Sequence, residues 1–132
     1  MYTSYMNNTR HPEEHVPLSA QAFRLLVALA EKPMHGYGII EQYRHDAGAE
    51  AAPAATNIYS LMRRLEREKL IEKQDVNFSV TSPVGRQPYQ LTATGSAVLK
   101  RECRQVAQLT EIGLKRLAIA RRRDALNATT QI

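Results

Sequence analysis

The ten residues Glu31–Ile40, EKPMHGYGII, constrain the fold of this chain more than any other stretch. They end one apolar run and begin another, with Pro33 and two glycines, Gly36 and Gly38, between the two runs. Proline has no backbone N–H and disfavours helical geometry in the residue before it, so a preceding helix must stop there. The glycines would let a following helix cross its neighbour closely. The stretch therefore predicts two helices joined by a tight turn.

The apolar residues on either side support these two helices. Ser19 stands where an N-cap is expected, and in the helix that follows apolar residues recur at positions i, i+3, i+4 and i+7. Its predicted inward stripe consists of Phe23, Leu26, Val27 and Ala30, widened by Ala22, Leu25 and Leu29. The second helix is expected from about Gly36 to Ala47, with Ile39, Ile40 and Tyr43 directed inward.

A third helix, from about Ala54 to Lys69, has the sharpest two-sided pattern in the chain. Its apolar stripe consists of Ile58, Leu61, Met62 and Leu65. At about 100° per residue, the opposite side shows short polar or basic side chains. These are Thr56, Ser60, Arg63 and Arg67, flanked by Tyr59 and Arg64. This helix is predicted to bury one face and to present the other to solvent.

The pattern then changes to two short strands around a turn-rich tip, LIEKQDVNFSV, SPVGRQP and YQLT. Thr92 or Thr94 can cap a final long helix that is expected to end at about Arg123. Along this helix apolar or small residues alternate at spacings of four and three, which is the seam of a coiled coil and requires a partner helix. The predicted dimer interface consists of Leu99, Cys103, Val106, Leu109, Thr110, Gly113, Leu117 and Ala120.

Composition limits the class of protein. The 132 residues suit one domain, and no apolar run approaches the ~20 residues that span a bilayer. The N-terminus lacks the basic and apolar segments of a signal peptide, and Cys103 has no partner for an internal disulfide, so a cytoplasmic protein is expected. Residues 1–53 hold 4 Lys/Arg and 6 Asp/Glu, whereas residues 54–123 hold 14 and 6. The second half would attract a polyanion, although an ordinary basic surface has the same composition.

The predicted fold is mainly α with a small two-stranded β-hairpin, a winged helix–turn–helix with a long C-terminal dimerisation helix. Residues 1–17 are expected to be a flexible arm, 18–92 the DNA-binding domain, 93–123 the dimerisation helix and 124–132 a frayed tail. Because a major groove about 12 Å wide accepts one α-helix, the polar face of the third helix is the predicted reading surface. The candidate DNA contacts are Thr56, Asn57, Tyr59, Ser60, Arg63 and Arg64, with Arg86 and Gln87 on the wing.

Three segments in this order resemble the PadR family of transcriptional regulators: LLVALAEKPMHGYGII, NIYSLMRRLEREKLIE and GRQPYQLTATG. The resemblance runs from about Leu18 to Leu99, and the helix after it suits the short-tailed type. It implies a homodimeric repressor of a palindromic operator, often released from DNA by a small aromatic or amphipathic effector. Two positions depart from the family: Thr56-Asn57 stand where Gly-Thr is usual, and Lys69 stands where Gly is usual. The first departure suggests a different operator.

Other functions find less support in the sequence. His11, Glu14 and His15 match an H-x-x-E-H zinc motif, but Pro12 breaks the helix that this motif needs, so no metal or cofactor is expected. No phosphate loop or nucleophile–base pair indicates an enzyme. A winged-helix module that binds protein instead of DNA remains the alternative, although it would not need the arginines of the third helix.

Several side chains allow two interpretations. His35 is either a pH switch or a turn histidine with a satisfied hydrogen bond, and Cys103 is either a redox sensor or a small buried residue of the seam. Tyr37 and Tyr59 are candidate core aromatics, and Tyr59 could equally contact a phosphate. The Arg121–Arg123 cluster could contact DNA or simply complement the C-terminal end of a helix dipole.

Overall fold

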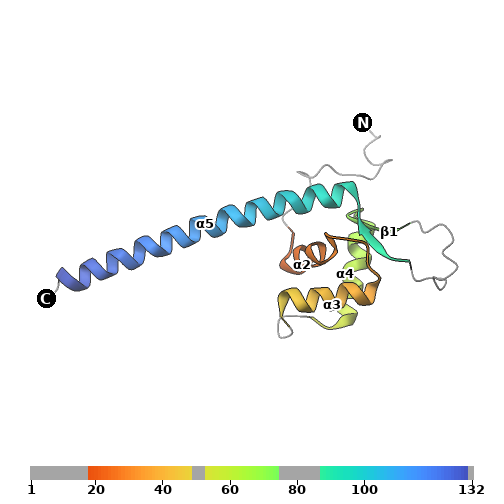
Figure 1. Ribbon diagram of the computed structural model, residues 1–132, viewed down its shortest axis with the longest axis horizontal. Helices are drawn as coiled ribbons and strands as arrows, with labels where there is room; N and C mark the ends of the chain where they lie inside the picture. The colour runs from red at the N-terminus through yellow and green to blue at the C-terminus, as the bar shows by residue number, and fades with distance from the viewer. Residues whose placement is uncertain (1–17, 49–52, 75–86, 131–132) are drawn as a thin grey trace. The chain divides into compact units, whose positions relative to one another are not determined.

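The computed structural model describes residues 18–48, 53–74 and 87–130. In chain order the elements are α2 (Ala20–Leu29), α3 (Gly36–Ala47), α4 (Ala55–Arg67), β1 (Ile71–Lys73), β2 (Tyr89–Leu91) and α5 (Ala93–Thr130). The chain divides into two compact units, residues 1–100 and residues 101–132. In the first unit, α2, α3 and α4 contact one another and surround an apolar core beside the two-strand hairpin (Figure 1). Within the described residues no helix is long and apolar enough to cross a membrane.

The first helix begins as the sequence predicts, because the Ser19 side chain accepts a hydrogen bond from the Ala22 N–H at 3.1 Å. Its buried face differs from the predicted stripe. Val27 is 37% exposed, Ala30 is exposed and Phe23 is half-buried at the edge of the core. The core takes Leu26 and the three residues predicted to widen the stripe, Ala22, Leu25 and Leu29. Both series have helical spacing, so periodicity alone could not distinguish them.

The turn between α2 and α3 does more than reverse the chain. The Met34 N–H donates to the Tyr89 carbonyl at 2.9 Å, and the Tyr89 N–H donates to the Met34 carbonyl at 2.7 Å. This isolated bridge adds the turn to the edge of the hairpin at β2. The tight stop around Pro33 therefore lets the chain pass along β2 before Gly36 starts α3.

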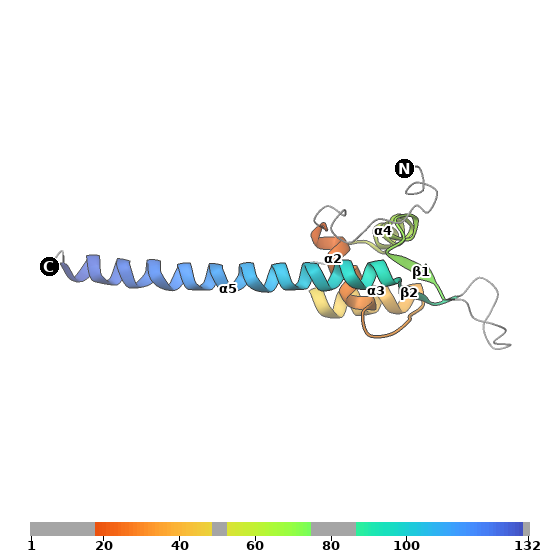
Figure 2. The same cartoon turned by 90° about the horizontal axis from the view of Figure 1, so that it is seen from above.

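The two strands are antiparallel, with Ile71 opposite Leu91 and Lys73 opposite Tyr89. Beside this pair, the Gln90 amide donates to the Glu72 carboxylate at 3.0 Å. A view turned by 90° shows β1 and β2 side by side (Figure 2). The predicted hairpin is confirmed as a two-stranded element, while residues 75–86, which include Arg86, lie outside the described residues.

A tight junction joins the end of α4 to the start of α5. Lys69 has a left-handed backbone, with φ of 65°, and this conformation lets the Leu70 N–H donate to the Leu65 carbonyl at 3.0 Å. The Thr92 hydroxyl donates to the Lys69 carbonyl at 2.6 Å and accepts from the Gly95 N–H at 2.9 Å. Thr92 therefore caps α5 and holds the end of α4 with the same oxygen.

The long helix extends further than predicted. It was expected to end at about Arg123, with residues 124–132 frayed, but α5 continues to Thr130. No glycine or proline follows Arg123, and the Thr129 hydroxyl donates to the Ala125 carbonyl at 2.9 Å. Leu99 also differs from its predicted place in the seam, because it is only 7% exposed and belongs to the core of the first unit.

Two glycines of α5 provide a matched test of the junction. A Cβ built at Gly95 would lie 1.9 Å from the Leu70 carbonyl oxygen, whereas a Cβ at Gly113 would meet nothing within 4 Å. We expect Gly95→Ala to lower the free energy of unfolding by about 3 kcal/mol, the upper range for overpacking. Gly113→Ala should raise it by up to about 1 kcal/mol through helix propensity. Urea unfolding of both variants measures the difference, and equal effects would contradict the close contact at Gly95.

The backbone of Lys69 predicts a stabilising substitution. A side chain at positive φ is strained, and glycine removes this strain, so Lys69→Gly should increase the free energy of unfolding by roughly 1 kcal/mol. Lys69→Ala is the control, because it removes the ammonium group and keeps the Cβ. Thermal unfolding should rank Gly above both Lys and Ala. A gain for Ala equal to that for Gly would assign the effect to charge and not to the backbone.

Candidate nucleic-acid interface

The exposed face of α4 collects most of the predicted DNA contacts. Its opposite face is buried by Ile58, Leu61, Met62 and Leu65, as the sequence predicts. This burial fixes which side of the helix faces solvent. The structure leaves all six predicted residues of α4 exposed: Thr56, Asn57, Tyr59, Ser60, Arg63 and Arg64.

The start of this face is built from short side chains. Thr56 and Asn57 lie in the first turn of α4, after Ala54, which provides no side-chain cap. The Asn57 N–H donates to the Ala54 carbonyl at 3.0 Å, so its backbone is fixed while its side-chain amide remains exposed. An exposed amide offers both a donor and an acceptor, which is the pair that an adenine edge requires.

The basic residues of α4 are not equivalent. The Arg63 guanidinium donates to the Ser60 hydroxyl at 3.2 Å, which holds the arginine along the exposed face. The Arg64 Nε lies 3.7 Å from a Glu68 carboxylate oxygen, an exposed pair that partly compensates its charge. Arg67 continues the exposed face and was not among the predicted site residues. Among the described residues, Arg63 and Arg67 form no ion pair.

Tyr59 connects α4 to the first turn of α3. A Cβ at Gly36 would lie 2.9 Å from the Tyr59 ring and 3.5 Å from its hydroxyl, so only glycine fits this crossing without a shift. The ring is 39% exposed and therefore not a core aromatic, and Tyr37 is 69% exposed. This excludes the core interpretation for both tyrosines within the single chain. Tyr59 remains at the edge of the polar face, where a phosphate contact is sterically open.

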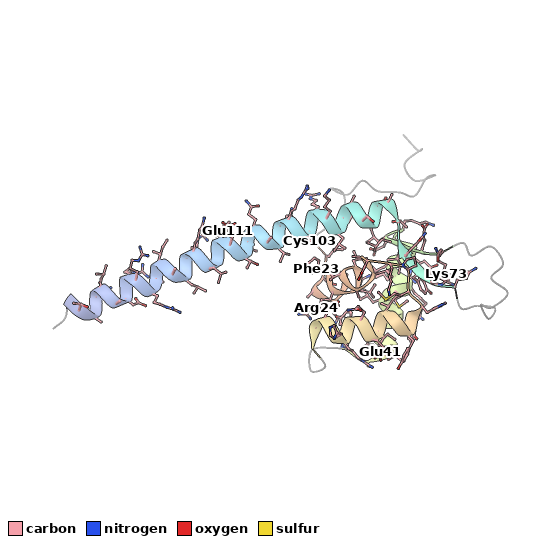
Figure 3. All side chains as sticks on the ribbon, viewed as in Figure 1. Phe23, Arg24, Glu41, Lys73, Cys103 and Glu111 are labelled. Atoms are coloured by element: carbon pink, nitrogen blue, oxygen red, sulfur yellow. The ribbon has the colours of Figure 1, made fainter. Side chains whose placement is uncertain are left out.

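His35 and the wing complete this surface. The His35 side chain is exposed and forms no hydrogen bond with the described residues, so the predicted satisfied hydrogen bond is absent there. On the wing Gln87 is exposed, and the Lys73 ammonium lies 6.0 Å from the centre of the Tyr89 ring (Figure 3). Lys73 was not among the predicted site residues, although its position at the end of a strand beside the predicted wing was the available signal.

The predicted dimer residues of α5 have little cover within one chain. Leu109 is 70% exposed, Leu117 is 68% exposed and Val106 is 42% exposed. Cys103 is also exposed within one chain, so its burial in the seam would require a partner helix. Thr110 and Gly113 are exposed and Ala120 is half-buried, so Leu99 is the member of the predicted set that the core accounts for.

The H-x-x-E-H string from His11 to His15, from which no metal site was expected, lies outside the described residues. The part of the chain that the structure describes contains no group of three or more His, Cys, Asp or Glu side chains that could hold a metal ion.

The fold and this exposed helix define a class, the winged helix–turn–helix regulators with a C-terminal helix. Residues 25–101 match the family described as the transcriptional regulator PadR-like family, and the chain belongs to this family. In a transposon, TN4556 of Streptomyces fradiae, an uncharacterized 37.1 kDa protein is 32% identical over 87 residues. That match covers 65% of this chain, and the chain spans only 23% of the relative's length.

Solved structures share the fold at low sequence identity. A PadR family transcription regulator from hypervirulent Clostridium difficile is 22% identical with a TM-score of 0.62, covering 75% of this chain and 99% of that one. A PadR-like regulator from Bacillus cereus is 21% identical with a TM-score of 0.61, covering 73% and 89%. Bacillus subtilis PadR, solved in complex with operator DNA, is 19% identical with a TM-score of 0.52, covering 63% and 46%.

Proposed function

We propose that this chain is a DNA-binding transcriptional regulator in which α4 enters the major groove. The observation that carries the proposal is the division of α4 into a fully buried apolar stripe and an exposed face of short polar side chains and arginines. Such a helix can approach base edges without exposing apolar surface. A repressor released by a small aromatic effector is the form of regulation that the family resemblance implies.

The exposed residues of α4 are expected to make two kinds of contact, with base edges and with backbone phosphates. Asn57 lies at the start of α4, and its amide suits a bidentate contact with adenine. Arg63 has a longer reach and no ion pair among the described residues, so a backbone phosphate is its expected partner. Ser60 holds Arg63 and therefore contributes to its orientation.

We expect Asn57→Ala and Arg63→Ala to weaken DNA binding in different ways. Arg63→Ala should weaken binding to all sequences and reduce the log–log salt slope by about one unit. Asn57→Ala should cost ~1–3 kcal/mol at one base pair of a half-site and leave the slope nearly unchanged. The measurement is a salt titration of each variant on operator and on random duplex DNA.

Arg24→Ala is the matched control, because it also removes an exposed arginine. Arg24 lies on α2, a helix that is not expected to contact DNA. If Arg63→Ala behaves like Arg24→Ala and Asn57→Ala retains full base preference, α4 is not the DNA-binding surface. The winged-helix protein-binding module would then be the better account of the chain.

We also propose that α5 forms a homodimer through its apolar seam. The seam residues Val106 and Leu117 are 42% and 68% exposed, and a soluble helix rarely leaves a row of such side chains in water without a partner. In such a dimer, two copies of α4 about 34 Å apart would each contact one half-site of a palindromic operator.

The double substitution Val106→Glu/Leu117→Glu should make the protein monomeric at micromolar concentration. Each buried seam residue lost is expected to cost about 2 kcal/mol or more of dimer stability. Gln105→Glu/Gln108→Glu adds the same charge to the same helix off the seam and should leave the dimer intact. Sedimentation velocity distinguishes the species, and a monomeric wild-type protein would disprove the dimer directly.

A further inference from the structure

The long helix carries a second repeated pattern, separate from the seam. Ile112, Ile119 and Leu126 recur every seven residues. The two isoleucines are each followed, three and four residues later, by a pair of basic residues. At about 100° per residue these positions share one side of α5, and its edge at Arg116 and Arg123 lies next to the seam position of Leu109. This basic apolar face consists of Ile112, Lys115, Arg116, Ile119, Arg122, Arg123 and Leu126.

Ion pairs among the described residues leave most of the positive charge of this basic apolar face uncompensated. Ile119 is 63% exposed, and among the described residues the Lys115 ammonium has only an exposed pair with Glu111 at 3.6 Å. In the described part of the chain, Arg116, Arg122 and Arg123 form no ion pair.

The helix dipole does not account for the arginines either. Its effect on charged side chains falls off within the last turn. Because α5 continues to Thr130, the Arg121–Arg123 cluster lies well before that turn. The expectation that this cluster complements a helix end is therefore wrong.

We propose that the basic apolar face binds an acidic amphipathic helix of a partner protein. The seven-residue period of the apolar row is the period of a coiled coil, which an approaching helix can match over roughly 20 Å. Ile112, Ile119 and Leu126 would form the apolar contacts, and carboxylates of the partner would flank them on both sides. This contact uses only α5 and goes beyond the proposed binding of DNA by α4.

Charge distinguishes this partner from the other occupants. A second copy of the same face would oppose four cations with four cations. The α2 helix of a second copy carries Arg24 and no carboxylate, so it offers no complementary charge. DNA phosphates would match the basic residues but leave the apolar row unused. A membrane surface requires a wider apolar face than this single row provides.

The experiment uses the intact protein and two synthetic peptides of three heptads. Both peptides have Leu at positions a and d, and positions e and g are all Glu in one and all Lys in the other. Fluorescence anisotropy should show the Glu peptide binding about tenfold or more tighter than the Lys peptide. The fourfold variant Lys115→Glu/Arg116→Glu/Arg122→Glu/Arg123→Glu should reverse this preference, while Arg122→Lys/Arg123→Lys should retain it.

Equal binding of the two peptides by the wild-type protein would overturn the proposal, and so would an unchanged preference in the fourfold variant. An Ile119→Ser variant that binds the Glu peptide as tightly as wild type would exclude the apolar contact. Binding to phosphatidylserine vesicles or to duplex DNA that requires Arg122 and Arg123, without binding to the Glu peptide, would assign the face to a membrane or to nucleic acid. The wild-type comparison needs no substitution, so a misfolded variant cannot conceal the outcome.

Discussion

The junction between α4 and α5 is the contact on which the arrangement of the first unit depends. A single hydroxyl, that of Thr92, holds the Lys69 carbonyl at the end of α4 and caps the first turn of α5. Gly95 then brings the α5 backbone against the Leu70 carbonyl, closer than any residue with a Cβ could. These contacts fix the end of the proposed recognition helix to the start of the helix that carries the seam. Four residues, Lys69, Leu70, Thr92 and Gly95, therefore join the proposed recognition helix to the first turn of α5.

The distribution of charge gives each unit a different character. Residues 1–100 hold 11 Lys/Arg and 10 Asp/Glu, whereas residues 101–132 hold 7 and 3. The net charge of +5 is thus concentrated on the distal part of α5, and α4 presents its arginines on an otherwise nearly neutral unit. A nearly neutral unit limits non-specific attraction to phosphates, which leaves more of the discrimination to base contacts.

Elements were predicted correctly from the sequence where the apolar pattern or the local chemistry allowed only one arrangement. The apolar stripe of α4 has a single phase, so its buried residues were predicted correctly, and the cap at Ser19 and the start of α3 at Gly36 follow from local chemistry. The predicted stripe of α2 was too wide, because two helical series overlap between Ala22 and Ala30 and only one of them is buried. Burial of Leu99 could not be predicted from the seam alone, since it results from packing within the core of the first unit.

One structural detail bears on a departure from the family pattern, and another is a contact between helices that the sequence did not predict. Lys69 stands at a usual glycine position because the left-handed backbone remains accessible to lysine at a modest cost. Gly36 leaves space for the ring of Tyr59, which lies on the flank of α4. Periodicity does not encode this contact between helices. The selection of the site on α4 needed only the phase of one helix, and the same phase already placed Arg67 on the polar face.

We propose that a dimer of this chain reads DNA with two copies of α4. The most direct test is a binding selection with the intact protein on random duplex DNA. We predict enrichment of a two-fold symmetric motif whose half-sites are centred about one helical turn, ~34 Å, apart. Enrichment of no motif, or of a single unrepeated half-site, would contradict this account.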